Sequence, residues 1–371
     1  MTAEKANPRA SKASGYIPSL DGWRALAVLA VISVHDTVHR AGPVSTAVLN
    51  REGHRGVNLF FAISGILICS RLLEEERRFG KISLRRFYIR RVCRIQPAAM
   101  LYLAVVGIMA LMHRLPLTLG AFLSAALYFR NYYPFHGGIN NATEFTNHFW
   151  SLSMEEHFYL LFPMFLVLCV KRRAVILAVI AALLAVWNAI VSGTPALQFG
   201  PVLVWRTDVS LNEILIPALI AILLSTPSIQ QSAIRWIHPW SALVLAVALS
   251  VFAKFHVPAL SVVAGILVYP LLLLGTMLHP QSYLTRFLEL APLRFIGRIS
   301  FSLYLWQQLL FTGTYTGPPP LGVLAAFPLN FITVFALATL TYYFVEKPMI
   351  RLGHQLAPPA SPGRSDIEKV S

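Results

Sequence analysis

The chain has 371 residues, of which 56% are hydrophobic and 13% are charged, and its mean hydropathy is +0.62. This composition is too apolar for a soluble domain of that size, and several apolar runs approach the roughly 20 residues that cross a hydrocarbon core. The formal net charge of +15 does not indicate nucleic-acid binding, because the Lys and Arg residues cluster between apolar runs and form no nucleic-acid-binding motif. The three cysteines lie within or beside apolar runs and predict neither a disulfide framework nor a metal cluster.

The apolar runs, taken in chain order, predict an all-α polytopic transmembrane bundle of about ten spanning helices. By residue number, the expected spans are 18–40, 56–73, 97–112, 149–170, 174–191, 209–224, 240–253, 260–278, 299–314 and 321–344. A shorter apolar piece at 117–129 would place the basic segment 171–173 outside if it crossed the membrane. We therefore expect a short re-entrant or interfacial helix there.

With these spans, both chain termini lie in the cytoplasm, together with the basic segments 71–94, 171–173, 286–298 and 347–351. The composition of residues 1–15 and 353–371 predicts disordered cytoplasmic tails on either side of one transmembrane domain, 16–352. The N-terminal tail has no short apolar core ending at a cleavage site. The first span is therefore expected to act as an uncleaved anchor.

The first predicted helix carries Arg24 near its start and His35 near its end. In an α-helix these residues lie on one face, roughly 20° apart around the axis and about 16 Å apart along it. An ionisable side chain inside a membrane usually faces the bundle interior and has a function. The alternative is that Arg24 reaches a lipid headgroup and His35 lies near the opposite interface. His35 and His39 have the spacing of a metal pair, but no third ligand lies nearby, so we expect no resident metal.

A second polar cluster opens the span that begins at about residue 149. Glu155 and Glu156 are adjacent, and an apolar run follows them, so at least one carboxylate is expected to point into the bundle. Acidic residues in the first turn of a helix also interact favourably with its dipole, which explains one glutamate better than two. Ser151 and Glu155 share a helix face, as do Trp150 and Ser153.

Two further sets of charged residues lie at the predicted ends of spans. Arg91 and Arg94 are one helical turn apart at the cytoplasmic end of a span, where they could hold a phosphorylated donor; the alternative is an amphipathic basic helix lying on anionic lipid. Arg206 and Asp208 are expected to pair in a loop at the outer surface. A plain surface ion pair there would contribute little to stability.

These clusters occur in an ordered set of motifs that resembles acyltransferase family 3, whose members are integral membrane proteins that O-acylate sugars of surface polysaccharides and some secondary metabolites. The resemblance covers about residues 16–352. It rests on Leu20-Asp-Gly-Trp-Arg24-Ala with His35, Gly56-Val-Asn-Leu-Phe-Phe-Ala-Ile-Ser64-Gly65, Phe87-Tyr-Ile-Arg-Arg91-Val-Cys-Arg94-Ile, Trp150-Ser-Leu-Ser153-Met-Glu155-Glu-His-Phe-Tyr159, Arg206-Thr-Asp208, Phe295-Ile-Gly-Arg-Ile-Ser300-Phe-Ser-Leu-Tyr304-Leu-Trp306 and Val345-Glu346-Lys-Pro348.

The chain departs from the family pattern at three positions. Gln307 stands where a histidine is usual, Pro217 where a glycine is common, and His157 where a glutamine is frequent. None of these changes removes a residue expected to be catalytic. Gln307 does put a role for that C-terminal position in doubt.

The resemblance implies an O-acyltransferase that moves an acyl group, most commonly acetyl, from cytoplasmic acyl-CoA to a sugar hydroxyl of a cell-surface or exported glycan. By this resemblance Arg24 and His35 match the arginine and histidine implicated in activity. We expect His35 to be the general base or itself to accept the acyl group, and Glu155 to be a second catalytic residue that either orients His35 or binds sugar hydroxyls. The expected donor-binding residues are Arg24, Arg91, Arg94, Ser64, Trp150 and Ser153, and the expected acceptor-binding residues are Glu156, Arg206 and Asp208.

Acyl-CoA is expected as a substrate, with no permanently bound cofactor. The other expected partners are the glycan or another hydroxylated acceptor and membrane lipid, without nucleic acid; a homo-oligomer is left open. The expected location is the bacterial cytoplasmic (inner) membrane. Two alternatives remain at this stage: acylation of a small secondary metabolite or lipid, and a lipid or sugar transporter that does no chemistry. A transporter would favour paired half-helices in two repeats, and the sequence shows no such symmetry.

Overall fold

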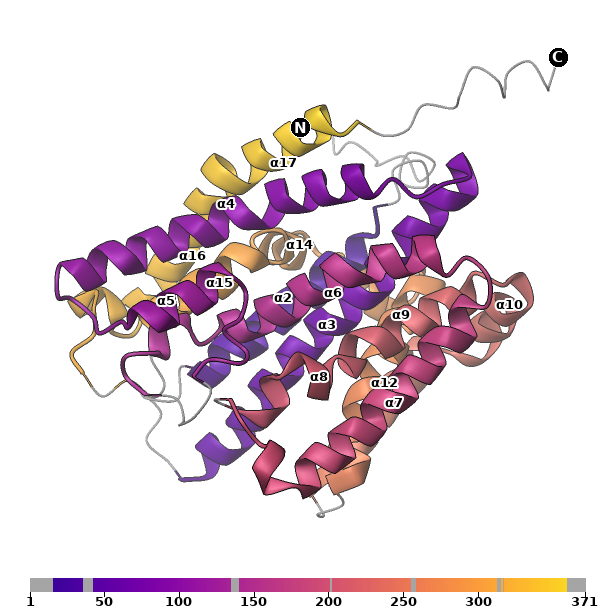
Figure 1. Cartoon of the computed structure of the whole chain (residues 1–371), viewed down its shortest axis with the longest axis horizontal. Coiled ribbons are helices and arrows are strands. Elements are labelled where there is room, and N and C mark those ends of the chain that lie inside the picture. The colour runs from indigo at the N-terminus through magenta and orange to yellow at the C-terminus, as the bar shows by residue number, and fades with distance from the viewer. Residues whose placement is uncertain are drawn as a thin grey trace.

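The structure is a computed structural model that describes residues 16–35, 43–134, 140–200, 202–254, 258–311, 315 and 317–358, and these residues form helices, turns and loops without a strand (Figure 1). The longer helices are α2 (Pro18–His35), α3 (Pro43–Phe79), α4 (Leu84–Leu111), α6 (Phe149–Leu168), α7 (Arg173–Gly193), α9 (Asn212–Leu224), α10 (Pro227–Trp236), α11 (Pro239–Lys254), α12 (Pro258–Leu278), α15 (Ser300–Leu310), α16 (Leu329–Thr341) and α17 (Lys347–Leu356). The shorter ones include α5 (Leu119–Ala126), α8 (Thr207–Ser210), α13 (Tyr283–Leu288) and α14 (Ala291–Arg298).

Helices α2, α3 and α6 lie in the middle of the bundle (Figure 1). Helix α2 packs against α3 and α14, and α3 also packs against α9. Two glycines allow these close approaches: a Cβ on Gly56 would meet the Ala27 carbonyl oxygen at 2.6 Å, and a Cβ on Gly297 would overlap the Asp21 carbonyl oxygen. The backbone at the start of α2 is therefore fixed against α14, which sets the position of the charged residues that follow.

The remaining helices form two groups beside this centre (Figure 1). Helix α4 packs along α17, and α15 packs against α16. On the other side α7 packs against α9, and α11 against α12. Buried apolar side chains form one large cluster, and a smaller cluster joins α2 and α3 to α12. The all-helical bundle expected from the sequence is confirmed.

Within the described residues, four helical stretches are long and apolar enough to cross a membrane: Gly56–Phe79, Leu84–Leu111, Arg173–Gly193 and Leu329–Leu356. A fifth span is possible if the pair Asn212–Leu224 and Pro227–Trp236, which is bent by 111°, counts as one. Helices α2 and α6, which carry Asp21, Arg24, Glu155 and Glu156, are not among them. Length and composition thus support a membrane protein with four or five spans, fewer than the ten expected.

Several expected boundaries were wrong. A loop was expected between the spans 18–40 and 56–73, but the chain is helical from Pro43. The basic segment 71–94 was expected between spans, but it belongs largely to α3 and α4, which are separated by a bend at Gly80. Pro97 lies inside α4 instead of opening it. Arginine is a good helix former, and the Ser83 hydroxyl accepts a hydrogen bond from the Arg86 amide at 3.5 Å, which starts α4 well before the apolar run.

The C-terminal third also differs from expectation. Helices α10, α13 and α14 were not expected, and the segment 286–298, predicted as a basic loop, is largely helical. Helix α16 starts at Leu329, and a π-helical turn at Tyr342–Glu346 joins it to α17, which runs past the expected domain end at 352. Helix α5 agrees with the short helix expected within 117–129. The expected tail 1–15, most of the tail after 352, residues 36–40 of the first span and His39 lie outside the described residues.

Candidate active site

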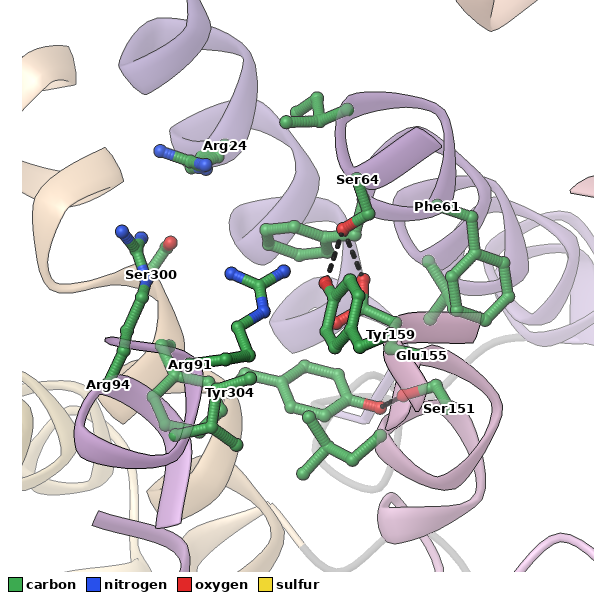
Figure 2. Close-up of a pocket in the computed structure, with 16 residues that line it drawn as sticks. Arg24, Phe61, Ser64, Arg91, Arg94, Ser151, Glu155, Tyr159, Ser300 and Tyr304 are labelled. Atoms are coloured by element: carbon green, nitrogen blue, oxygen red, sulfur yellow. Dashed lines mark hydrogen bonds between the residues drawn. The ribbon is translucent and has the colours of Figure 1, made fainter. Parts of the chain in front are cut away.

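A cavity of about 100 Å³ lies among α2, α3, α4, α6 and α15 (Figure 2). By volume it has room for several waters or a small acyl group. It brings together five residues that the sequence predicted, Arg24, Ser64, Arg91, Arg94 and Glu155. The rest of its wall is formed by Val57, Phe60, Phe61, Ile63, Ile95, Ser151, Leu152, Tyr159, Ser300, Phe301 and Tyr304.

Arginines dominate the charge of this cavity. Arg24 pairs with Asp21, 3.3 Å between Nη1 and Oδ1, and its side chain is 19% exposed. Arg91 and Arg94 project from consecutive turns of α4. They lie within electrostatic range of each other and of Arg24. Arg94 is exposed and Arg91 half-buried, so Arg94 lies at the mouth of the cavity. Arg71, which the sequence analysis did not single out, adds a fourth positive charge within electrostatic range. Such a cluster attracts an anionic ligand.

A serine, a glutamate and a tyrosine face one another inside the cavity (Figure 2). The Ser64 hydroxyl donates to Glu155 Oε1 at 2.7 Å and lies 2.9 Å from the Tyr159 hydroxyl. The Arg91 guanidinium lies 3.6 Å from the centre of the Tyr159 ring, a cation–π contact. Glu155 therefore points into the bundle, as its place in an apolar helix predicted, and lies among cations.

The wall of the cavity also carries a second pair of hydroxyls, one on α6 and one on α15. Ser151 Oγ lies 2.6 Å from the Tyr304 hydroxyl, and Tyr304 also donates to the His148 carbonyl oxygen at 2.9 Å. Ser151 and Glu155 both line the cavity, which confirms that they share a face of α6. These bonds join α6 to α15.

His35 lies at the end of α2 and does not line the cavity. Its Nδ1 is 2.9 Å from the Val31 carbonyl oxygen, and its ring is half-buried. Glu144 acts electrostatically on it. In the described part of the chain no hydrogen bond joins His35 to Glu155, which bonds Ser64 instead. A role for Glu155 in orienting His35 therefore stays a prediction, and the structure shows Glu155 in the cavity wall and His35 outside it.

Three other predicted residues lie outside the cavity wall. Trp150 is buried and stacks on Trp205 with ring centres 5.2 Å apart. Ser153 is buried, donates to the Phe149 carbonyl oxygen at 2.8 Å and accepts from the Arg130 amide at 3.3 Å. Glu156 is half-buried and does not line the cavity. Trp150 and Ser153 serve packing and backbone contacts in this structure.

Arg206 and Asp208 do pair, as the sequence predicted. Arg206 Nη2 lies 2.6 Å from Asp208 Oδ2, and the guanidinium is 3.8 Å from the centre of the Phe199 ring. The Arg206 side chain is only 2% exposed, so this is not a plain surface ion pair. Burial raises the pKa of Asp208, but hydrogen bonds from Arg206 and Trp187 outweigh burial and hold that pKa below its usual range. The pair lies away from the arginine-lined cavity.

Sequence reasoning missed Tyr159, Tyr304, Ser151 and Ser300 as site residues. Tyr159 follows Glu155 by four residues and so shares its helix face, a signal that could have identified it. Tyr304 and Ser300 belong to a motif quoted above, but their distance in sequence from α6 gave no reason to place them opposite it. Within the described residues, no group of three or more His, Cys, Asp or Glu residues is arranged to hold a metal ion.

The family model for the acyltransferase family 3 domain, described as an acyltransferase domain, matches residues 17–344 of the chain. The chain is therefore a member of that family. No solved structure matches it significantly.

Curated relatives give the comparison more detail. The chain is similar to a candidate peptidoglycan O-acetyltransferase, YrhL, of Bacillus subtilis (30% identical, over 90% of this chain and 55% of the relative). It is also similar to a candidate O-acetyltransferase of Staphylococcus aureus strain COL (29%, over 91% and 58%) and to the peptidoglycan O-acetyltransferase OatA of Listeria monocytogenes (28%, over 91% and 56%). The chain thus spans little more than half the length of these relatives.

Proposed function

We propose that this protein transfers an acetyl group from acetyl-CoA to a hydroxyl of a sugar in a cell-surface or exported glycan. The observation that carries this proposal is the cavity in which Arg24, Arg91 and Arg94 surround the Ser64–Glu155 contact, in a chain of an acyltransferase family. The names of the relatives, peptidoglycan O-acetyltransferases among them, support acetyl as the group and a glycan as the acceptor.

The arginine cluster suits the donor. Arg91 and Arg94 would bind the phosphates of CoA through charge-assisted hydrogen bonds, with Arg71 adding to the potential. The pantetheine arm would then enter past Arg24, and Ser64 would contact the thioester end. Trp150 and Ser153 were expected to bind the donor. In this proposal they do not contact it and only help to pack α6, which carries cavity residues.

The chemistry requires a base, because a sugar hydroxyl is a poor nucleophile at neutral pH. His35 would take the hydroxyl proton as general base, a role that the ordinary pKa of imidazole suits. An acyl group carried by His35 itself is the second route. The acceptor would approach from the side of the bundle where α2 ends, with Arg206, Asp208 and Glu156 as candidate contacts for its hydroxyls.

The reaction joins a cytoplasmic donor to an acceptor on the far side, so we place the protein in the bacterial cytoplasmic membrane with both termini inside. In this proposal α2, α6, α11, α12 and α15 cross as well as the five stretches identified by composition, with the bent pair counted as one, which gives ten spans. Arg24 on α2 and Ser151 and Glu155 on α6 line the cavity, and facing it instead of lipid lowers the cost of burying them. Cysteine labelling from each side of the membrane tests this topology.

The function is tested with the purified chain in lipid nanodiscs. Incubation with radiolabelled acetyl-CoA and solubilised peptidoglycan fragments should release CoA and yield acetylated fragments; His35→Ala should abolish both without loss of protein. CoA release with a small alcohol or lipid acceptor but not with glycan would favour the metabolite alternative. Transport of the acceptor into vesicles without CoA release would favour a transporter and contradict the proposal.

A further inference from the structure

The buried imidazole of His148 lacks a partner. His148 directly precedes α6 and is 3% exposed. In the described part of the chain, neither Nδ1 nor Nε2 makes a hydrogen bond. Buried polar groups in native proteins nearly always have a partner, and an unpaired one destabilises the fold. Two unpaired nitrogens on a buried ring therefore suggest that a ligand forms a hydrogen bond with one of them during the reaction.

Aromatic side chains hold this ring in one orientation. Tyr102 and Phe149 contact it edge to face, with ring centres 5.0 and 4.9 Å away, and Tyr304 lies at 5.6 Å. The Tyr304 hydroxyl also donates to the His148 carbonyl oxygen. The imidazole is thus positioned by packing, and in the described part of the chain neither of its nitrogens bonds a protein group. A group held in this way is preorganised for a hydrogen bond to a substrate.

The position of His148 is between the two parts of the proposed site. On one side, Tyr304 and Ser151 belong to the wall of the donor cavity. On the other, His35 lies within electrostatic range of His148. His148 therefore contacts the wall of the donor cavity through Tyr304 and lies within electrostatic range of the proposed base.

We propose that His148 is a second catalytic histidine, whose ring N–H donates a hydrogen bond to the oxyanion formed from the acetyl carbonyl. This inference rests on the proposed function. The acceptor oxygen bonds to the carbonyl carbon, its proton passes to His35, and the carbonyl oxygen becomes the oxyanion. When the carbonyl re-forms, the carbon–sulfur bond breaks and the CoA thiolate takes the proton from His35. A neutral imidazole has one N–H to donate, which suits this role.

A structural role and a catalytic role make opposite predictions for His148→Phe. Phenylalanine keeps the aromatic contacts and removes two unpaired nitrogens, so the variant should unfold at the same temperature as the wild type or at a higher one. If His148 stabilises the oxyanion, kcat should fall about 100-fold or more, with the KM for acetyl-CoA unchanged. His148→Gln, which keeps an N–H donor, should recover part of that loss.

His279→Phe is the matched control, because His279 Nε2 is also a buried imidazole nitrogen without a partner in the described residues. The His279 ring stacks on His238, at 4.6 Å between ring centres, and does not line the cavity. Its kcat should equal that of the wild type. A kcat within threefold of wild type for His148→Phe would overturn the inference. Should that variant not fold, His148→Leu, which also lacks a donor, decides: full kcat overturns the inference, and a loss of about tenfold or more at unchanged KM supports it.

The two proposals fail separately. If the wild type releases no CoA with any acceptor, the proposed function is wrong. If His35→Ala abolishes transfer and His148→Phe does not, the function stands and only the role of His148 is wrong.

Discussion

Ser64 on α3 and Glu155 on α6 are joined by a hydrogen bond of 2.7 Å from the serine hydroxyl to Oε1 of the glutamate, although 91 residues separate them in sequence. The bond lies in a cavity whose other charged residues are arginines. A carboxylate in that setting can hold the serine hydroxyl in one direction and limit the repulsion among the cations. Removing the Glu155 carboxylate should therefore lower both the rate of the reaction and the affinity of the cavity for the donor.

Glu155→Gln is expected to lower kcat/KM for acetyl-CoA roughly 10- to 100-fold, because a hydrogen bond to a charged group contributes about 1.5–3 kcal/mol. The amide keeps the size of the side chain but removes its charge. Steady-state CoA release measures the effect. Glu156→Gln is the matched control, since the neighbouring glutamate does not line the cavity; equal losses in the two variants would contradict a specific role for Glu155.

The cavity shows which parts of a site can be predicted from sequence. Arg24 and Glu155 were identified because an ionisable residue in an apolar helix is conspicuous, and Arg91 because it lies one helical turn from Arg94 at the end of a predicted span. Tyr304 was not, because a tyrosine beside a membrane span has many ordinary positions, and only the packing of α15 on the bundle places it beside Ser151.

The same limit applies to the fold. Hydropathy located most of the helices but misplaced both ends of α3 and the start of α4. These ends are polar, and they are helical because of helix propensity and, for α4, the Ser83 cap, neither of which the apolar pattern shows. The sequence also did not predict which neighbours a side chain on a given helix would face. Trp150 and Ser153 lie only one turn or less from cavity residues, yet they face packing partners.

Arg94→Glu should raise the KM for acetyl-CoA about tenfold or more and leave acceptor binding unchanged, because the new charge repels the phosphates at the mouth of the cavity. In the wild type, the KM should rise with salt, as expected for exposed charges. Arg85→Glu is the control: it makes the same charge change at an exposed position of α4 outside the cavity. An equal KM change in both variants would indicate a general surface effect and contradict donor docking at Arg94.

Gly297→Ala is expected to lower the thermal midpoint by several degrees, because its Cβ would overlap the Asp21 carbonyl oxygen and push α14 away from α2. Scanning fluorimetry in detergent measures the shift. Gly193→Ala has open space around the new methyl group and should change the midpoint little. If the two variants were equally stable, the close contact between α14 and α2 would be wrong.

Asp208→Asn should lower stability at pH 7, and the difference from wild type should shrink in acid. The pKa of Asp208 in the folded protein lies below its usual value, since hydrogen bonds from Arg206 and Trp187 outweigh the effect of burial. The stabilisation is therefore fully present above the unfolded pKa of about 4 and disappears as the pH falls through the folded pKa. Thermal midpoints between pH 3 and pH 7, roughly the range over which carboxylates titrate, measure this dependence.

Glu289→Gln is a control for Asp208→Asn, because the pKa of Glu289 is shifted in the opposite direction. Burial raises the pKa of Glu289, and the positive charge of Arg294 only partly offsets that effect. A carboxyl group with a raised folded pKa stabilises the fold at low pH and less as the pH rises through its unfolded value. Replacing it should leave stability at pH 7 unchanged or slightly higher. If Asp208→Asn instead destabilised the protein equally at every pH, its effect would come from lost packing or hydrogen-bond geometry and not from the charge that pairs with Arg206.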